Sequence, residues 1–227
     1  AIRPQIIKNH ASGNFQAMHI QIIKSGKFGF FIMLLILLPL CGNIDYVLGL
    51  WLVDVPAHTA NFVVLVLLYS LLDGILTPIA IGVFAQGEIK AYEIALCIIY
   101  AVNFIASYVC LKLGMAPETV FVLNIAFKAC VLADLLVHSK AKYAFPVHAF
   151  LKQCLLPSAV VFVLSGAFTY FMPWEAPNSF WEFLLHTLAI IICTSLMALA
   201  IGMTKGERLF LKKNLRDKIT VKLYRKI

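Results

Sequence analysis

The chain has 227 residues, of which 62% are hydrophobic and only 13% are charged, and its mean hydropathy is +0.90. A water-soluble domain of this length does not need so apolar a composition, so that class of protein is excluded. The formal net charge is +8, and the positions of the basic residues decide what this charge means.

Six apolar stretches predict six transmembrane helices. Each is close to the ~20 residues that cross ~30 Å of hydrocarbon at ~1.5 Å per residue. Spans this apolar must be helical, because backbone groups in lipid have no water to bond and the runs do not alternate as barrel strands do. The expected fold is an all-α polytopic bundle with spans at residues 28–44, 60–84, 92–111, 119–138, 154–171 and 183–203.

Segments of mixed polarity flank the bundle of residues 28–203. Residues 1–27 interleave apolar and polar side chains around Ser12-Gly13, which predicts a cytoplasmic approach of one or two short amphipathic helices. Residues 204–227 carry Leu211, Leu215 and Ile219 at four-residue steps among basic residues. This pattern predicts a basic amphipathic tail that lies on anionic lipids of the inner leaflet.

The basic residues gather in alternate connections, which predicts the orientation of the chain. Four precede the first stretch, Lys90 lies between the second and third, three lie between the fourth and fifth (Lys140, Lys142 and Lys152), and nine follow the sixth. The other connections hold only Lys112. The positive-inside rule therefore places both termini in the cytoplasm. The net charge is explained by topology and anionic lipid, so no nucleic-acid partner is expected.

The second stretch contains a carboxylate beside a helix-breaking residue. Pro78 removes a backbone hydrogen bond from the preceding turn, and Gly82 follows one turn later. We expect a kink or a short unwinding there, as in transporters whose broken helices act as gates, although an ordinary proline kink remains open. Asp73 lies about halfway along this span.

Lys128 and Asp134 lie within the fourth stretch and are the best candidates for a substrate site. An ionisable group at a helix centre costs about 2.5–3.5 kcal/mol on insertion scales, so such groups usually face a protein interior or a water-filled cavity. Counting from the span ends puts Asp73 and Lys128 at similar depth, which allows them to pair. Asp134 follows Lys128 by six residues, roughly 120° around the helix. Two roles for Lys128 stay open, neutralisation of Asp73 and attraction of an anionic substrate.

Catalytic and metal-binding signatures are missing from the sequence. There is no G-x-x-x-x-G-K-[ST] phosphate loop, no H-E-x-x-H and no G-x-S-x-G. The six cysteines fall in or beside apolar spans without a C-x-x-C pair, which indicates small buried side chains. Thr194, Ala198 and Gly202 form a small-residue stripe that predicts close helix packing. We therefore expect no enzyme, no cofactor and no metal.

Four parts of the sequence resemble a transporter family. They are R-P-Q-I-I-K-N-H-A-S-G-N at 3–14, the first span with Pro39, L-G-L-W-L-V-D-V-P at 48–56 and A-Q-G-E-I-K-A-Y at 85–92. Together they resemble the C-terminal half of bacterial polysaccharide (O-antigen type) flippases, which belong to the multidrug/oligosaccharidyl-lipid/polysaccharide exporter superfamily. The resemblance implies a multi-pass protein of the bacterial inner membrane that moves a lipid-diphosphate-linked oligosaccharide between leaflets.

The same resemblance implies a partner and leaves alternatives open. The partner is the N-terminal half of the same transporter, related to this bundle by a pseudo-twofold axis, and the cationic cavity residue of the family corresponds to Lys128. A cation-coupled multidrug exporter of the same superfamily would instead rely on Asp73 and Asp134. A polytopic membrane transferase would need a polar constellation at one membrane face, for which His138 and His148 are the available groups.

Overall fold

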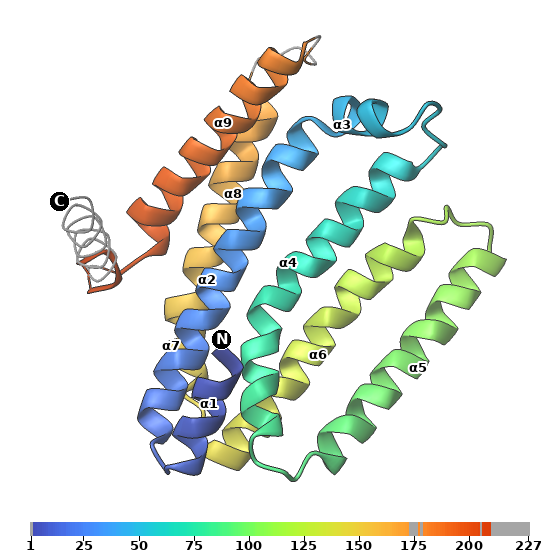
Figure 1. Ribbon diagram of the computed structural model, residues 1–227. Helices are drawn as coiled ribbons and strands as arrows, with labels where there is room; N and C mark the ends of the chain where they lie inside the picture. The colour runs from blue at the N-terminus through green and yellow to red at the C-terminus, as the bar shows by residue number, and fades with distance from the viewer. Residues whose placement is uncertain (1, 173–176, 178, 205, 210–227) are drawn as a thin grey trace.

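The computed structural model describes residues 2–172, 177, 179–204 and 206–209. Every element assigned within these residues is helical, and Figure 1 shows their arrangement. The α-helices are α1 (Ile2–Ala11), α2 (Phe15–Gly42), α3 (Ile44–Trp51), α4 (Thr59–Phe84), α5 (Lys90–Lys112), α6 (Thr119–Tyr143), α7 (Val147–Phe150), α8 (Leu156–Phe171) and α9 (Phe180–Met197). Two π-helical segments, η1 (Leu151–Leu155) and η2 (Ala198–Gly202), continue α7 into α8 and extend α9.

Six helical stretches are long and apolar enough to cross a membrane, which confirms the predicted all-α, multi-pass fold. They are Phe15–Gly42, Thr59–Phe84, Lys90–Lys112, Thr119–Tyr143, Val147–Phe171 and Phe180–Gly202. The first begins earlier than the predicted span at residue 28, because α2 runs without interruption from Phe15. The turn before it has Gly13 at φ +70°, and the Asn14 side chain accepts from the Ala17 backbone N–H to cap α2.

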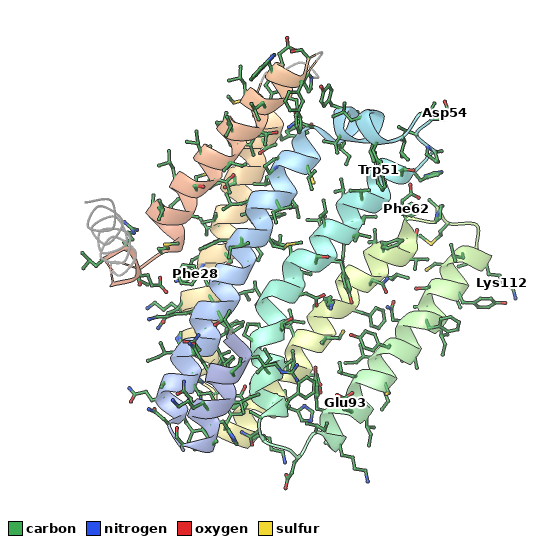
Figure 2. The ribbon with its side chains drawn as sticks, in the orientation of Figure 1. Phe28, Trp51, Asp54, Phe62, Glu93 and Lys112 are labelled. Atoms are coloured by element: carbon green, nitrogen blue, oxygen red, sulfur yellow. The ribbon has the colours of Figure 1, made fainter. Side chains whose placement is uncertain are left out.

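Successive long helices run in alternate directions, so the connections collect at two ends of the bundle (Figure 1). The turn at 12–14 and the connections 85–89 and 144–146 lie at one end, which we call the basic end because it carries Lys90, Lys142 and Lys152. Connections 52–58 and 113–118 lie at the other, called here the opposite end, where Trp51 and Asp54 are found (Figure 2). That the basic end faces the cytoplasm stays a prediction of the charge distribution.

Helices α2 and α4 form the centre of the bundle and cross at a pair of glycines. A Cβ built on Gly29 would lie 3.1 Å from the carbonyl oxygen of Gly74, and a Cβ on Gly74 would lie 3.1 Å from the backbone of Gly29. The Gly74 carbonyl is also the group that Pro78 leaves without its partner within α4. The two backbones therefore approach as closely as they do only because neither position has a side chain.

Small residues elsewhere also serve packing. A Cβ on Gly82 would lie 2.7 Å from the Tyr143 hydroxyl, and one on Gly202 would lie 2.3 Å from the Phe31 ring. Thr194 and Ala198 are 1% and 5% exposed, so the predicted small-residue stripe faces the bundle. By contrast α5 stands at the edge of the bundle and packs mainly against α6 (Figure 1). Its remaining apolar faces suit contact with lipid.

Candidate functional site

A charged pair joins α4 and α6 inside the membrane-spanning region. The Lys128 ammonium donates to the Asp73 carboxylate and also lies 4.0 Å from the centre of the Tyr69 ring. Tyr69 stands one turn before Asp73 on α4, so both groups reach the same ammonium. The pairing that the sequence suggested from depth alone is therefore present.

The two members of this pair differ in exposure. Only 7% of the Lys128 side chain is exposed, against 46% of the Asp73 side chain. The ammonium is held inside the bundle and the carboxylate projects from it. Because a carboxylate that faces hydrocarbon is costly, its exposed half is best accommodated by a polar path alongside α4.

Asp134 does not join this pair. Its Oδ1 lies 3.1 Å from Nδ1 of His138 on the same helix, and Oδ2 is buried without a hydrogen-bond partner within the described part of the chain. The His138 ring contacts Tyr92 of α5 edge-on, with 5.9 Å between ring centres. The sequence analysis placed Asp134 about 120° around the helix from Lys128, and the structure accordingly has two separate polar clusters, Asp73–Lys128 and Asp134–His138.

Polar groups continue along α6 from one end of the bundle to the other. Near the opposite end, Asn124 accepts from Asn103 of α5 at 2.5 Å. At the basic end, Lys142 binds the Glu88 carboxylate. We call this series the α6 polar stripe, and it comprises Glu118, Asn124, Lys128, Asp134, His138 and Lys142.

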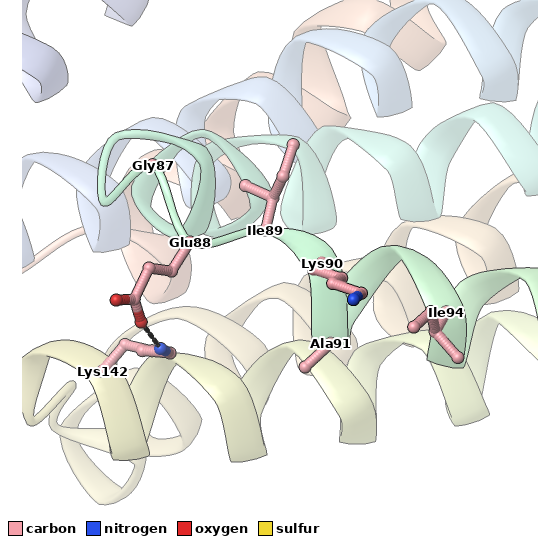
Figure 3. Close-up of a pocket in the computed structure, with 7 residues that line it drawn as sticks. All are labelled: Gly87, Glu88, Ile89, Lys90, Ala91, Ile94 and Lys142. Carbon is pink, nitrogen blue, oxygen red and sulfur yellow. Dashed lines mark hydrogen bonds and ion pairs between the residues drawn. The ribbon is translucent and has the colours of Figure 1, made fainter.

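The basic end of the stripe borders a cavity of about 550 Å³ (Figure 3). It is formed by residues 87–91 together with Ile94 and Lys142. Glu88 and Lys142, which both line it, form an ion pair (Figure 3), and the hydrogen bond from Lys142 lowers the pKa of the exposed Glu88 carboxyl. Lys90 lines the same cavity, so the charge there is net positive.

The opposite end of the stripe is closed by a polar cluster that ties two connections together. Glu118 accepts from Asn61 at 3.0 Å and lies 2.5 Å from Nδ1 of His58, a residue with φ +69° at the start of α4. The Asn61 hydrogen bond, Glu118's own backbone N–H and the His58 contact together lower the pKa of the Glu118 carboxyl to about 2. This cluster fixes α4 and α6 side by side where they begin.

A second buried ion pair was missed by sequence reasoning. Lys27 is 1% exposed and donates to Oε2 of Glu207 at 2.6 Å. Oε2 of Glu207 also accepts from the Thr204 backbone N–H, and the Glu207 N–H donates to the Thr204 hydroxyl. The motif T-x-x-E at 204–207 is a capping box that could have been recognised. Burial alone would raise the pKa of Glu207, but these hydrogen bonds outweigh it and lower the pKa.

The predicted gating residues lie within regular, packed helix. Helix α4 is continuous through Pro78, which is buried. Gly82 leaves room for the Tyr143 hydroxyl, which in turn approaches the carbonyl oxygen of Ile79 at 3.5 Å. The structure thus gives Gly82 a packing role, whereas gating by Pro78 and Gly82 stays a prediction.

Other sequence expectations concern cysteines, metals and the tail. All six cysteines are free thiols, but only Cys154 is buried and Cys97 and Cys130 are exposed, so the expectation that all six are buried was wrong. No group of three metal-ligating side chains occurs among the residues that the structure describes. Leu211, Leu215 and Ile219 of the expected tail helix lie outside the described residues. No protein-family model, no curated protein and no solved structure matches the chain.

Proposed function

We propose that this chain is the C-terminal bundle of a transporter that moves lipid-diphosphate-linked oligosaccharides across the bacterial inner membrane. The observation that carries the proposal is the Asp73–Lys128 pair, a charged site within the spans whose carboxylate is half exposed. Charged groups at such a depth usually mark a substrate or ion path. The resemblance to polysaccharide flippases supplies the substrate class.

The pair suggests how an anionic head group is handled. A diphosphate needs a positive charge in place of water, and Lys128 is a cation held inside the spans beside a half-exposed carboxylate. Because Lys128 is bound to Asp73, the diphosphate must displace the carboxylate, which then takes up a proton or a cation. Substrate movement and ion binding are linked by this exchange, and the N-terminal bundle supplies the facing wall of the path.

The α6 polar stripe extends the same route in both directions. Toward the basic end it leads past Asp134 and His138 to the cationic cavity at Lys90 and Lys142. Toward the opposite end it leads past Asn124 to the Glu118 cluster. A head group that carries sugars needs hydrogen-bonding partners along its whole path, and this stripe offers them at intervals of four to six residues.

Translocation in proteoliposomes tests the proposal. The bundle is reconstituted with its N-terminal half, and a fluorescent lipid diphosphate-linked oligosaccharide reports flipping through its accessibility to an external quencher. We expect Lys128→Met to slow flipping by about tenfold or more, the loss of one charge-assisted contact. Lys128→Arg should retain most activity, and Lys112→Met serves as a matched control at the opposite end. Unchanged flipping by Lys128→Met contradicts the proposal.

One observation favours a second candidate, the cation-coupled multidrug exporter. The exposed member of the pair is Asp73 and the buried member is Lys128, so the group offered first to a ligand is an anion. For this alternative Asp73→Asn abolishes transport of a cationic dye, and Lys128→Met has little effect. The two variants in the two assays therefore separate the candidates.

A further inference from the structure

A groove runs along α8, away from the α6 polar stripe. At the basic end it begins as a cavity of about 620 Å³, lined by His148, Leu151, Lys152, Leu155, Leu156 and Ala159. A second cavity of about 350 Å³ lies deeper, and its wall includes Phe30, Leu72, Ile125 and Phe162. Leu155 and Ala159 line both cavities, so the two are adjacent and meet at these residues.

The groove extends from the membrane interface to the middle of the bilayer. Lys152 stands in η1, shortly after the connection 144–146 at the basic end. Phe162 follows it by ten residues, roughly 15 Å of helix at ~1.5 Å per residue. That distance is half of the ~30 Å hydrocarbon layer, the depth that one acyl chain of one leaflet occupies.

The chemistry of the groove changes along its length. Its two polar side chains at the mouth, Lys152 and His148, are both exposed. Neither is paired with a carboxylate within the described part of the chain, and no Asp or Glu is among the described residues that line the two cavities. Beyond the mouth the lining is aliphatic and aromatic apart from Ser158. A cationic mouth on an apolar channel matches a lipid with a negative head group.

A π-helical turn forms part of the wall at the mouth of the groove. It is η1, which contributes Leu151, Lys152 and Leu155 to the lining. Such π-helical turns occur frequently at functional sites. Deeper in, the Ser158 hydroxyl is fully buried without a hydrogen-bond partner in the described chain, whereas the Thr169 hydroxyl on the same helix bonds the Ser165 carbonyl oxygen at 2.9 Å.

We infer that this groove binds an anionic phospholipid of the leaflet at the basic end. Its phosphate is held by Lys152 and His148, and one acyl chain passes Leu155 and Ala159 into the deep cavity. The other chain stays in the bilayer. This inference goes beyond the proposed function, because the site involves neither transport nor the Asp73–Lys128 pair.

Photo-crosslinking tests the assignment on the full chain. Vesicles contain phosphatidylglycerol that carries a diazirine at the end of one acyl chain, diluted in phosphatidylcholine, and labelled peptides are identified by mass spectrometry. We expect labels in the deep cavity at Leu72, Ile125 or Phe162. A probe with a choline head group reports binding without the anionic charge.

Two variants with matched controls probe the two ends of the groove. Lys152→Gln should lower labelling by the phosphatidylglycerol probe about fivefold, which is the effect of one basic residue on the binding of anionic lipid. Lys140→Gln, outside the groove, should leave this labelling unchanged. Ala159→Trp should fill the junction and abolish deep labelling. Val163→Trp adds the same bulk to a lipid-facing position of α8, 63% exposed, and should leave labelling intact.

Three results would overturn the inference. One is deep labelling that is equal for the two head groups and unaffected by Lys152→Gln. Another is displacement of the probe by a polyprenyl phosphate but not by unlabelled phosphatidylglycerol, which would make the prenyl carrier the occupant. The third is the absence of deep labels together with crosslinks between two copies of the chain, which would make the groove a protein interface. Because no transport is measured, failure here leaves the proposed function untouched.

Discussion

Substituting Asp73 should lower the free energy of unfolding more than substituting Lys128, its partner in the ion pair. Asp73→Asn leaves an ammonium that is only 7% exposed without its counter-ion, while the contact of this ammonium with the Tyr69 ring, 4.0 Å away, is present in both proteins and cancels. Breaking a buried pair in this way costs about 3–5 kcal/mol. Because the Asp73 side chain is 46% exposed, we expect Asp73→Asn to lower the free energy of unfolding by about 3 kcal/mol, the lower end of this range.

Lys128→Met should cost less, because the carboxylate that remains is 46% exposed. If its exposed half meets water in a polar path, the loss is that of a solvated ion pair, about 1 kcal/mol or less. If it meets hydrocarbon, the unpaired charge costs about 2.5–3.5 kcal/mol. Reversible unfolding in mixed micelles, with Lys112→Met as the control, measures both variants. A loss for Lys128→Met equal to or larger than that for Asp73→Asn would refute the polar path.

Three further predictions concern helix packing, the Lys27–Glu207 ion pair and pH. Gly74→Ala should destabilise the protein by about 1–3 kcal/mol in the same unfolding assay because its Cβ meets backbone at 3.1 Å, whereas Gly166→Ala, which meets nothing within 4 Å, should be neutral or slightly stabilising. Glu207→Gln leaves Lys27 buried without its counter-ion, so we expect the free energy of unfolding to fall by about 3–5 kcal/mol. A thermal midpoint equal to that of the wild type would contradict a stabilising Lys27–Glu207 pair. Glu118 has a lowered pKa of about 2, so its contribution is present above the ordinary value of 4.5 and disappears as the pH falls from 4.5 to about 2. Unfolding midpoints across this window should drop more for wild type than for Glu118→Gln, and parallel curves would contradict the assignment.

The spans could be predicted because the hydropathy of a segment depends on its own side chains and not on its neighbours in space. The depth of Asp73 and Lys128 follows from the same count, and so does the direction of Asp134 around α6. Its partner His138 is four residues on, which is a local spacing within reach of sequence reasoning. These parts of the candidate site are set by helix geometry alone.

Other parts depend on which helix faces meet, and the sequence does not contain that information directly. Lys27 and Glu207 are 180 residues apart, so their pairing requires the chain after η2 to return to α2. Lys27 was interpreted as one of the basic residues before the first span, yet it lies buried inside α2. Gly82 was predicted to be a flexible point of α4, but in the structure it packs against Tyr143 of another helix. The α8 groove likewise arises from side chains of several helices around a π-helical turn.

The central claim is that the face of α4 around Asp73 lines an aqueous substrate path. Thr77 is exposed one turn from Asp73, and Val163 of α8 is an exposed position on a different helix. In a background without native cysteines, Thr77→Cys should react with a water-soluble thiol reagent and be protected by lipid diphosphate-linked oligosaccharide, while Val163→Cys should not react. If Thr77→Cys is as unreactive as Val163→Cys, the face of α4 around Asp73 meets lipid and the account of a transport path is contradicted.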